Sequence, residues 1–216
     1  MINYKNLLIL FISTFFFSST FSQLRIEIKG GVEDPINIAI VPMKWELESP
    51  QAIYIHKIIE SDLESFGEFS VLSPERMLSL PTSKDEVFYK DWRLLGVDYL
   101  VIGQVKNTEF NAEVIVSYIL FDIAREKYIH RGDVIGPIQS LRKAGHKISD
   151  VIYKKIEGIP GIFSTKLAYI DKPSADDKNY NLRISDIDGY NGISLFSSPQ
   201  PLMSPNWSPS GDKMAY

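Results

Sequence analysis

A four-residue segment, Gly158-Ile159-Pro160-Gly161, divides the chain into two regions whose hydrophobic patterns belong to different kinds of fold. Before it, apolar runs alternate with stretches in which apolar residues recur at helical spacing. After it, only short strand-like runs separated by turn residues occur. Strands alternating with helices are typical of a sheet covered by helices, and strands alone are typical of an all-β fold. We therefore predict an α/β domain over residues 23–160 and an all-β region over residues 161–216.

The first region predicts a mixed sheet with helices on its faces. Apolar runs and period-2 alternation predict strands, whereas apolar residues at helical spacing predict helices. Strands are predicted over residues 36–41, 69–72, 99–105, 112–121 and 127–134. Helices are predicted over residues 52–66, 84–95 and 137–157, ending at Gly67, Gly96 and Gly158. The last two strands are joined by residues 122–126, so this hairpin adds antiparallel pairing to the sheet.

The second region contains a repeated pattern. Lys166-Leu167-Ala168-Tyr169 recurs as Lys213-Met214-Ala215-Tyr216, 47 positions further along the chain. A recurrence of about 40–50 residues among strands is the mark of β-propeller blades. The second copy follows Trp207-Ser208-Pro209-x-Gly211, in which proline fixes one φ angle and glycine allows a positive one. We predict the first part of a β-propeller.

The N-terminus predicts export. Lys5 precedes an uncharged apolar run over residues 7–17, and small polar residues follow up to Ser22. This is the pattern of a cleaved secretory signal peptide, and the run is shorter than the ~20 residues that span a bilayer. The alternative is a buried N-terminal strand or helix. We expect a signal peptide over residues 1–22, export across a membrane and no transmembrane segment after cleavage.

Composition argues against several classes of function. The chain has 216 residues and no cysteine, which excludes disulfides, thiol nucleophiles and thiolate metal sites. Its 23 basic and 27 acidic residues oppose a nucleic-acid partner, which requires a basic footprint.

No motif for catalysis or cofactor binding occurs. Gly-x-Ser-x-Gly, a phosphate loop and the dinucleotide Gly-x-Gly-x-x-Gly are absent. None of His56, His130 and His146 has a second His or Cys at metal-ligand spacing, which favours packing or surface roles for them. We therefore predict a protein that is not an enzyme and has no catalytic residue, cofactor or metal.

The segment Asp186-Ile187-Asp188-Gly189 resembles the start of a calcium loop. An EF-hand would need a third Asp or Asn at Tyr190 and a terminal Glu, and these are lacking. A hairpin with Asp188-Gly189 in its turn accounts for the residues better.

Three stretches, over residues 24–45, 142–170 and 182–216, together resemble the TolB family of the Tol–Pal envelope system. The resemblance implies an N-terminal α/β domain followed by a six-bladed propeller of WD40-like repeats. It implies a periplasmic, non-catalytic protein that binds TolA and Pal and supports outer-membrane integrity and constriction during cell division. It leaves open binding to other outer-membrane proteins. Only part of such a propeller is present in this sequence.

The start of the predicted mature chain is the candidate binding segment. Its apolar and polar residues alternate, so it is an amphipathic extended segment that can add to the edge of a partner's sheet. The resemblance implies that it engages TolA, and the alternative is a permanent edge strand of the domain. The candidate residues are Gln23, Leu24, Arg25, Ile26, Glu27, Ile28 and Lys29.

Two other functions stay open from the sequence. Some secreted serine hydrolases carry propellers with similar Trp-Ser-Pro-x-Gly turns next to a catalytic domain, and residues 1–216 include no such domain. An unrelated envelope sensor of the same architecture is the third interpretation. The residues that continue the gene beyond Tyr216 would distinguish further propeller repeats from a hydrolase domain.

Overall fold

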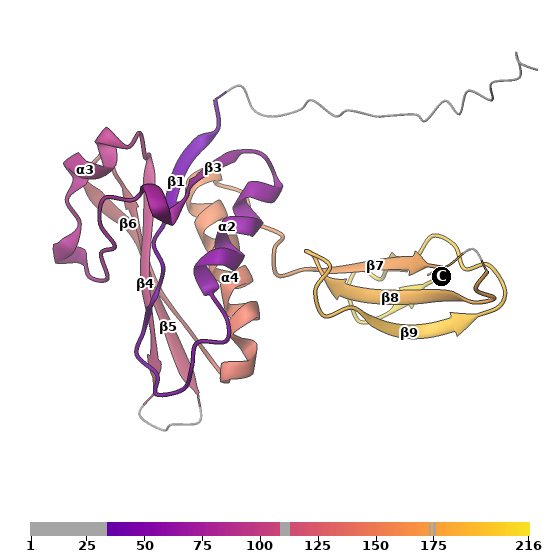
Figure 1. The fold of residues 1–216 in the computed structure, drawn as a ribbon. Coiled ribbons are helices and arrows are strands. Elements are labelled where there is room, and N and C mark those ends of the chain that lie inside the picture. Colours follow the sequence, from indigo (N-terminus) through magenta and orange to yellow (C-terminus); the bar gives the residue numbers. More distant parts are fainter. Residues whose placement is uncertain (1–33, 109–112, 173, 175) are drawn as a thin grey trace, which may run out of the picture. The chain divides into compact units, whose positions relative to one another are not determined.

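The computed structural model describes residues 34–108, 113–172, 174 and 176–216. The predicted signal peptide and the candidate segment from Gln23 to Lys29 lie outside these residues. Within the described chain, strands and helices alternate up to Gly158, and only strands follow it (Figure 1). This confirms the predicted fold class, a mixed α/β domain followed by the strands of a propeller.

The sheet of the α/β domain has six strands. Its order is β3-β1-β4-β5-β6, and β2 also pairs with β4. β1, β2, β3 and β4 pair in parallel, whereas β4, β5 and β6 form an antiparallel meander. The strands are β1 (Ile36–Ile40), β2 (Lys44–Trp45), β3 (Phe69–Leu72), β4 (Tyr99–Asn107), β5 (Val114–Asp122) and β6 (Lys127–Gly136).

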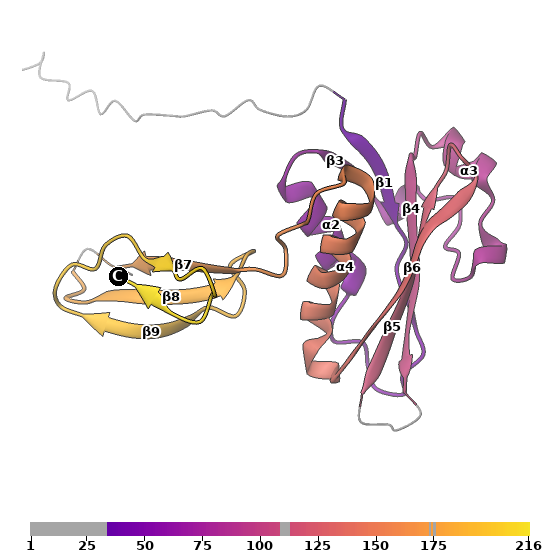
Figure 2. The same ribbon diagram turned by 180° about the vertical axis from the view of Figure 1, so that it is seen from behind.

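Within the described part of the chain, three α-helices cover the sheet. They are α2 (Ile55–Ser65), α3 (Tyr89–Leu94) and α4 (Leu141–Glu157), accompanied by the short 3₁₀ turns Pro74–Arg76, Lys84–Glu86 and Ile138–Ser140. α2 and α4 lie side by side on one face, and α3 lies on the other (Figures 1 and 2). Gly158 ends α4 with φ of +80°, a conformation that glycine adopts without the steric cost borne by other residues.

Alternation along the strands builds one core on each face of the sheet. Ile38 and Ile40 of β1 point into the core beneath α2 and α4, whereas Ala39 points into the core beneath α3. These side chains are fully buried, as expected for a strand with two covered faces. Close packing of the two long helices depends on Gly145, where an added Cβ would lie 2.9 Å from the Ile58 side chain.

One predicted helix is partly wrong. The segment predicted as a helix over residues 84–95 is a 3₁₀ turn, Lys84–Glu86, then two extended residues, then α3. The Ser83 and Glu86 side chains close a capping box on the 3₁₀ turn. Val87 leaves the helical path and is buried in the core beneath α3. Burial of an apolar side chain has here outweighed helix propensity.

The region after Gly158 consists of five strands, which we call the blade strands. β7 (Lys166–Asp171), β8 (Tyr180–Asp186) and β9 (Ile193–Ser198) form an antiparallel three-stranded sheet, and β10 (Asn206–Trp207) pairs with β11 (Met214–Ala215). Both copies of the repeated pattern contribute to strands. The turn before the second copy is closed by a 2.9 Å hydrogen bond from the Gly211 N–H to the Ser208 carbonyl.

The connection between α4 and β7 is anchored to α4. Both carboxylate oxygens of Asp150 accept backbone hydrogen bonds, from the N–H of Phe163 at 2.7 Å and from that of Ser164 at 3.1 Å. The Phe163 ring is 1% exposed and packs against Phe66 and Tyr153. The connection is therefore held by specific contacts and is not a free tether.

Candidate functional site

A buried polar cluster lies where α2 and α4 pack together. Asp62 of α2 faces His146 and Ser149 of α4, and all three side chains are at most 3% exposed. The two Asp62 carboxylate oxygens lie 3.0 and 2.9 Å from Nδ1 of His146, and the Ser149 hydroxyl donates to Asp62 at 2.7 Å. A buried carboxylate is tolerated only when such partners satisfy it. The contacts with Asp62 therefore fix the orientation of the His146 ring.

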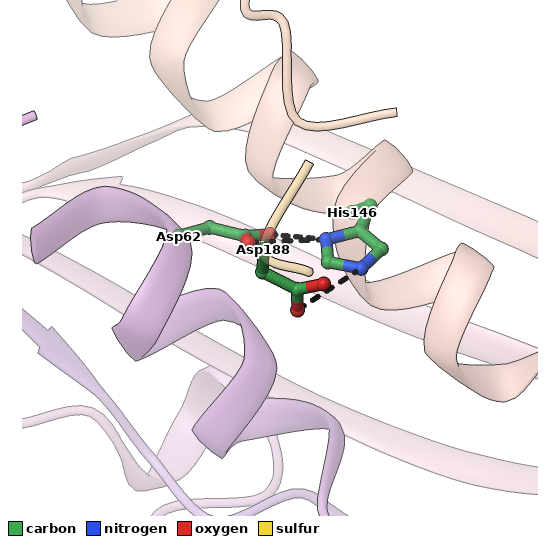
Figure 3. Close-up of side chains that lie close together, drawn as sticks. All are labelled: Asp62, His146 and Asp188. Carbon is green, nitrogen blue, oxygen red and sulfur yellow. Dashed lines mark hydrogen bonds and ion pairs between the residues drawn. The ribbon is translucent and has the colours of Figure 1, made fainter. Parts of the chain in front are cut away.

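The other nitrogen of the His146 ring faces the turn between β8 and β9, residues 187–192. Nε2 lies 3.7 Å from the Asp188 carboxylate, and Figure 3 shows Asp62 and Asp188 at the two different ring nitrogens. Nε2 is buried and has no hydrogen-bond partner among the described residues. Asp188 keeps about a quarter of its side chain exposed, at 24%. The site thus joins three segments far apart in the sequence.

Arg142, one turn before His146 on α4, binds the same loop. Its guanidinium forms an ion pair with Asp188 and lies 3.8 Å from the Asp186 carboxylate. Its central carbon lies 4.0 Å from the centre of the Tyr190 ring, within the range of a cation–π contact. Arg142 therefore contacts Asp186 at the end of β8 and both Asp188 and Tyr190 in the turn.

Asp186 is the second carboxylate at the end of this hairpin. Lys166 of β7 forms an ion pair with it, and the Asn191 side chain donates a 2.7 Å hydrogen bond. Burial opposes its ionisation, but the hydrogen bonds from Lys166 and Asn191 and the charges of Lys166 and His146 hold the pKa of this carboxyl below its ordinary value. The carboxyl is therefore ionised at neutral pH.

Asp62, His146 and Asp188 also have the residue types of a metal site, with one ligand atom from each lying within 4.8 Å of the others. Their geometry does not suit a metal. Asp62 occupies Nδ1 while Asp188 faces Nε2, so the two carboxylates lie at different nitrogens of the ring. The Arg142 cation already neutralises Asp188. The arrangement is that of an ion-pair network, in which a second cation would be repelled by Arg142.

The structure brings together only some of the residues that the sequence analysis considered. His146 is buried, and Asp188-Gly189 lies in a hairpin turn, as predicted, with Gly189 at φ of +82°. His56 is also buried, on α2, and His130 lies on β6. The candidate segment from Gln23 to Lys29 is outside the described residues, so its role stays a prediction.

Asp62 and Arg142 were not predicted from the sequence as members of the site. A signal for Asp62 was available, because it directly precedes Leu63 on the apolar stripe of α2 and so falls at the edge of the buried face. Its partner His146 is 84 positions away, and no spacing rule connects two helices of different segments. Only the packing of α2 against α4 pairs them.

Comparison with known proteins agrees with this architecture. The model of the TolB amino-terminal domain matches residues 24–129, and that of the TolB β-propeller domain matches residues 153–216. The chain belongs to the TolB family. Neither matching model describes a hydrolase, which favours the first of the interpretations made from the sequence.

Individual TolB relatives match most of the chain. The Tol-Pal system protein TolB of Hamiltonella defensa is 40% identical over 197 residues, which cover 90% of this chain and 45% of that protein. The protein of the same name from Alcanivorax borkumensis is 37% identical, with 90% and 44% covered. The crystal structure of TolB from Acinetobacter baumannii superimposes with a TM-score of 0.74 at 33% identity, covering 90% of this chain and 46% of that one.

The chain therefore spans a little under half the length of the TolB relatives that it matches. Among the residues that the structure describes, no helix combines the length and the apolar character needed to cross a membrane.

Proposed function

We propose that this TolB-family protein works by binding other proteins in a Tol–Pal envelope system, and that it is not an enzyme. The observation that carries this proposal is the match of both regions of the chain to TolB domains and to proteins named as Tol-Pal system components. The location that goes with this role is the periplasm, reached after removal of residues 1–22. The cellular role would be support of outer-membrane integrity and of constriction during division.

We assign TolA binding to the segment from Gln23 to Lys29 and Pal binding to the propeller. The alternation of the segment supports strand addition, because one face can pack against a partner while the backbone pairs with a sheet edge. The Gly30-Gly31 pair that follows the segment in the sequence predicts a break before the following domain. The propeller is the second expected binding surface, since stacked repeats present extended surfaces to partners.

Deletion of residues 23–29 tests the first assignment. We expect loss of measurable TolA binding by titration calorimetry and an unchanged thermal unfolding temperature of the α/β domain. Unchanged affinity for TolA would remove the segment from the binding site. The unfolding temperature is the control, because an unchanged value would show that loss of binding does not come from a disrupted core.

A matched pair of triple substitutions sharpens the test. Replacing Leu24, Ile26 and Ile28 by serine removes the apolar face, whereas replacing Arg25, Glu27 and Lys29 by serine removes the polar face. Burying one such apolar side chain contributes about 1.5–3 kcal/mol. We expect the first variant to weaken TolA binding by about 100-fold or more and the second by about tenfold or less. Equal effects would contradict recognition by one face of a strand.

Binding of Pal is tested with the full product of the gene. We expect it to bind purified Pal, and we expect the deletion of residues 23–29 to leave that affinity unchanged, because the two partners use different regions. A Pal affinity that depends on the segment would contradict the assignment of the two partners to separate surfaces.

A further inference from the structure

The His146 ring lies between two carboxylates, and this position determines which protons it carries. A neutral imidazole has one N–H and one nitrogen lone pair. With the proton on Nδ1, the lone pair of Nε2 faces Asp188 at 3.7 Å. With the proton on Nε2, the lone pair of Nδ1 faces Asp62 at 2.9 Å. Each neutral form therefore directs a lone pair at an anion, and only the imidazolium directs an N–H at both.

The charges around the ring lead to the same conclusion. The groups that face it or its partners are Asp62 from α2, Arg142 from α4, Asp186 and Asp188 from the β8–β9 hairpin, and Lys166 from β7. These are three carboxylates and two cations, so one negative charge is unbalanced when the ring is neutral. Burial makes an unbalanced charge costly. One proton on His146 balances the charges, whereas a divalent metal ion would leave one excess positive charge.

We infer that His146 is an imidazolium whose Nδ1–H donates to Asp62 and whose Nε2–H is directed at Asp188, and that with Arg142 it forms a proton-dependent latch for the β8–β9 turn. Asp62 and Ser149 belong to the α/β domain alone and hold the ring in place. Asp188 and Tyr190 belong to the turn and provide the groups that the latch holds. Loss of one ring proton leaves a lone pair against Asp188 and releases part of the turn's attachment.

The latch has a direction with pH. Imidazole is the side chain whose charge ordinarily changes between about pH 5 and 8. Because the ring gains its second proton on acidification and loses it on basification, raising the pH weakens attachment of the turn. Arg142 keeps its charge throughout and maintains the remaining contact with Asp188. The inference concerns attachment within the chain and does not depend on the proposed TolA and Pal partners.

The test uses NMR of the ¹⁵N-labelled protein between pH 6 and 8. Long-range ¹H–¹⁵N spectra show whether both His146 ring nitrogens carry protons, in which case their two shifts are nearly equal. Hydrogen exchange of the Asp186 and Gly189 amides, which donate to the Tyr190 and Asp186 carbonyls within the turn, reports attachment of the turn. We expect nearly equal ring shifts at pH 6 together with slow exchange in the turn. The exchange at pH 8 should rise by more than in H146Q, which carries no titrating ring.

A second pair of variants keeps the inference testable if the buried H146Q substitution perturbs folding. D188N removes the carboxylate that the latch holds, at a partly exposed turn position. D177N makes the same change at an exposed position whose carboxylate has no hydrogen bond or ion pair among the described residues. Loss of a charged hydrogen bond corresponds to about tenfold or more. We expect D188N to speed exchange in the turn by about that factor and D177N to leave it unchanged.

Three results would overturn the inference. The first is a pair of widely separated His146 ring shifts, as in a neutral tautomer, under conditions where the turn is protected. The second is equal exchange in D188N and D177N. The third is a change of the His146 ring signals on adding one equivalent of Zn²⁺ together with greater protection of the turn, which would make the ring a metal ligand.

Discussion

The α/β domain and the blade strands differ in how completely they bury the apolar side chains of their strands. In β4, Leu100 and Val101 point to opposite faces of the sheet and both are 0% exposed. In β9, Ile193 is 54% exposed and Phe196 is 43% exposed. Among the described residues past Gly158, only Phe163 and Leu182 are buried hydrophobic residues.

The difference follows from what covers each sheet. The helices α2, α3 and α4 belong to the same segment as the strands of the α/β domain, so this domain covers both faces of its sheet by itself. A propeller blade has no helices, and its faces are covered by the sheets of adjacent blades. The composition of a strand therefore predicts that one of its faces will be buried. It does not predict which element will cover that face.

The largest expected effect that tests this comparison is a pair of Phe→Ala substitutions, one in each region. Phe121 of β5 is 0% exposed, so F121A leaves a cavity and should lower the free energy of unfolding by about 3–5 kcal/mol. F196A in β9 removes an exposed ring and should change it by about 0.5 kcal/mol or less. Urea denaturation followed by tryptophan fluorescence measures both, and similar losses would contradict the comparison.

The next largest effect is expected from a substitution in the connection between the two regions. A Cβ on Gly161 would lie 2.7 Å from the Cα of Asp150, which is backbone and cannot give way cheaply. G161A should therefore lower the free energy of unfolding by about 1–3 kcal/mol. Gly136 has no neighbour within 4 Å of an added Cβ, which makes G136A the matched control. A neutral G161A would show that the connection is not anchored on α4.

Limited proteolysis compares the two regions directly. Backbone that is covered by few buried side chains opens at lower free energy, so we expect cleavage after Gly161 to be about tenfold or more faster than within residues 36–157. Mass spectrometry of the first products identifies the sites. Equal resistance on the two sides of Gly161 would mean that the blade strands are as stable as the α/β domain.

The smallest effect is a dependence of stability on pH, arising from His56 in the α/β domain. Burial, followed by the charge of Lys57, lowers the pKa of His56 from its ordinary 6.5. Below about pH 6.5 the unfolded chain therefore binds a proton more readily than the folded one, and the free energy of unfolding should fall with the pH. H56Q should show a shallower decline between pH 7 and 5 in thermal unfolding. An identical slope would contradict the assignment.

Local signals in the sequence were sufficient for most of the fold. Runs such as residues 36–41 and 99–105 gave strands because a strand buried on both faces needs nearly continuous apolar residues. Gly67 and Gly158 gave helix ends because few other residues adopt positive φ there. The helix predicted over residues 84–95 was wrong at Val87. This side chain is buried in a core formed with strands that are distant in the sequence, and the local helical pattern does not reveal that.

The sequence by itself determined the order of strands and helices, the change of fold at Gly158 and the repeated pattern of the blade strands. These depend on spacing along the chain, which is visible without coordinates. The pairing of Asp62 with His146, and of His146 and Arg142 with the β8–β9 turn, was decided only by tertiary structure. Buried charges are satisfied by partners in space, and the positions of those partners are fixed by packing rather than by sequence distance.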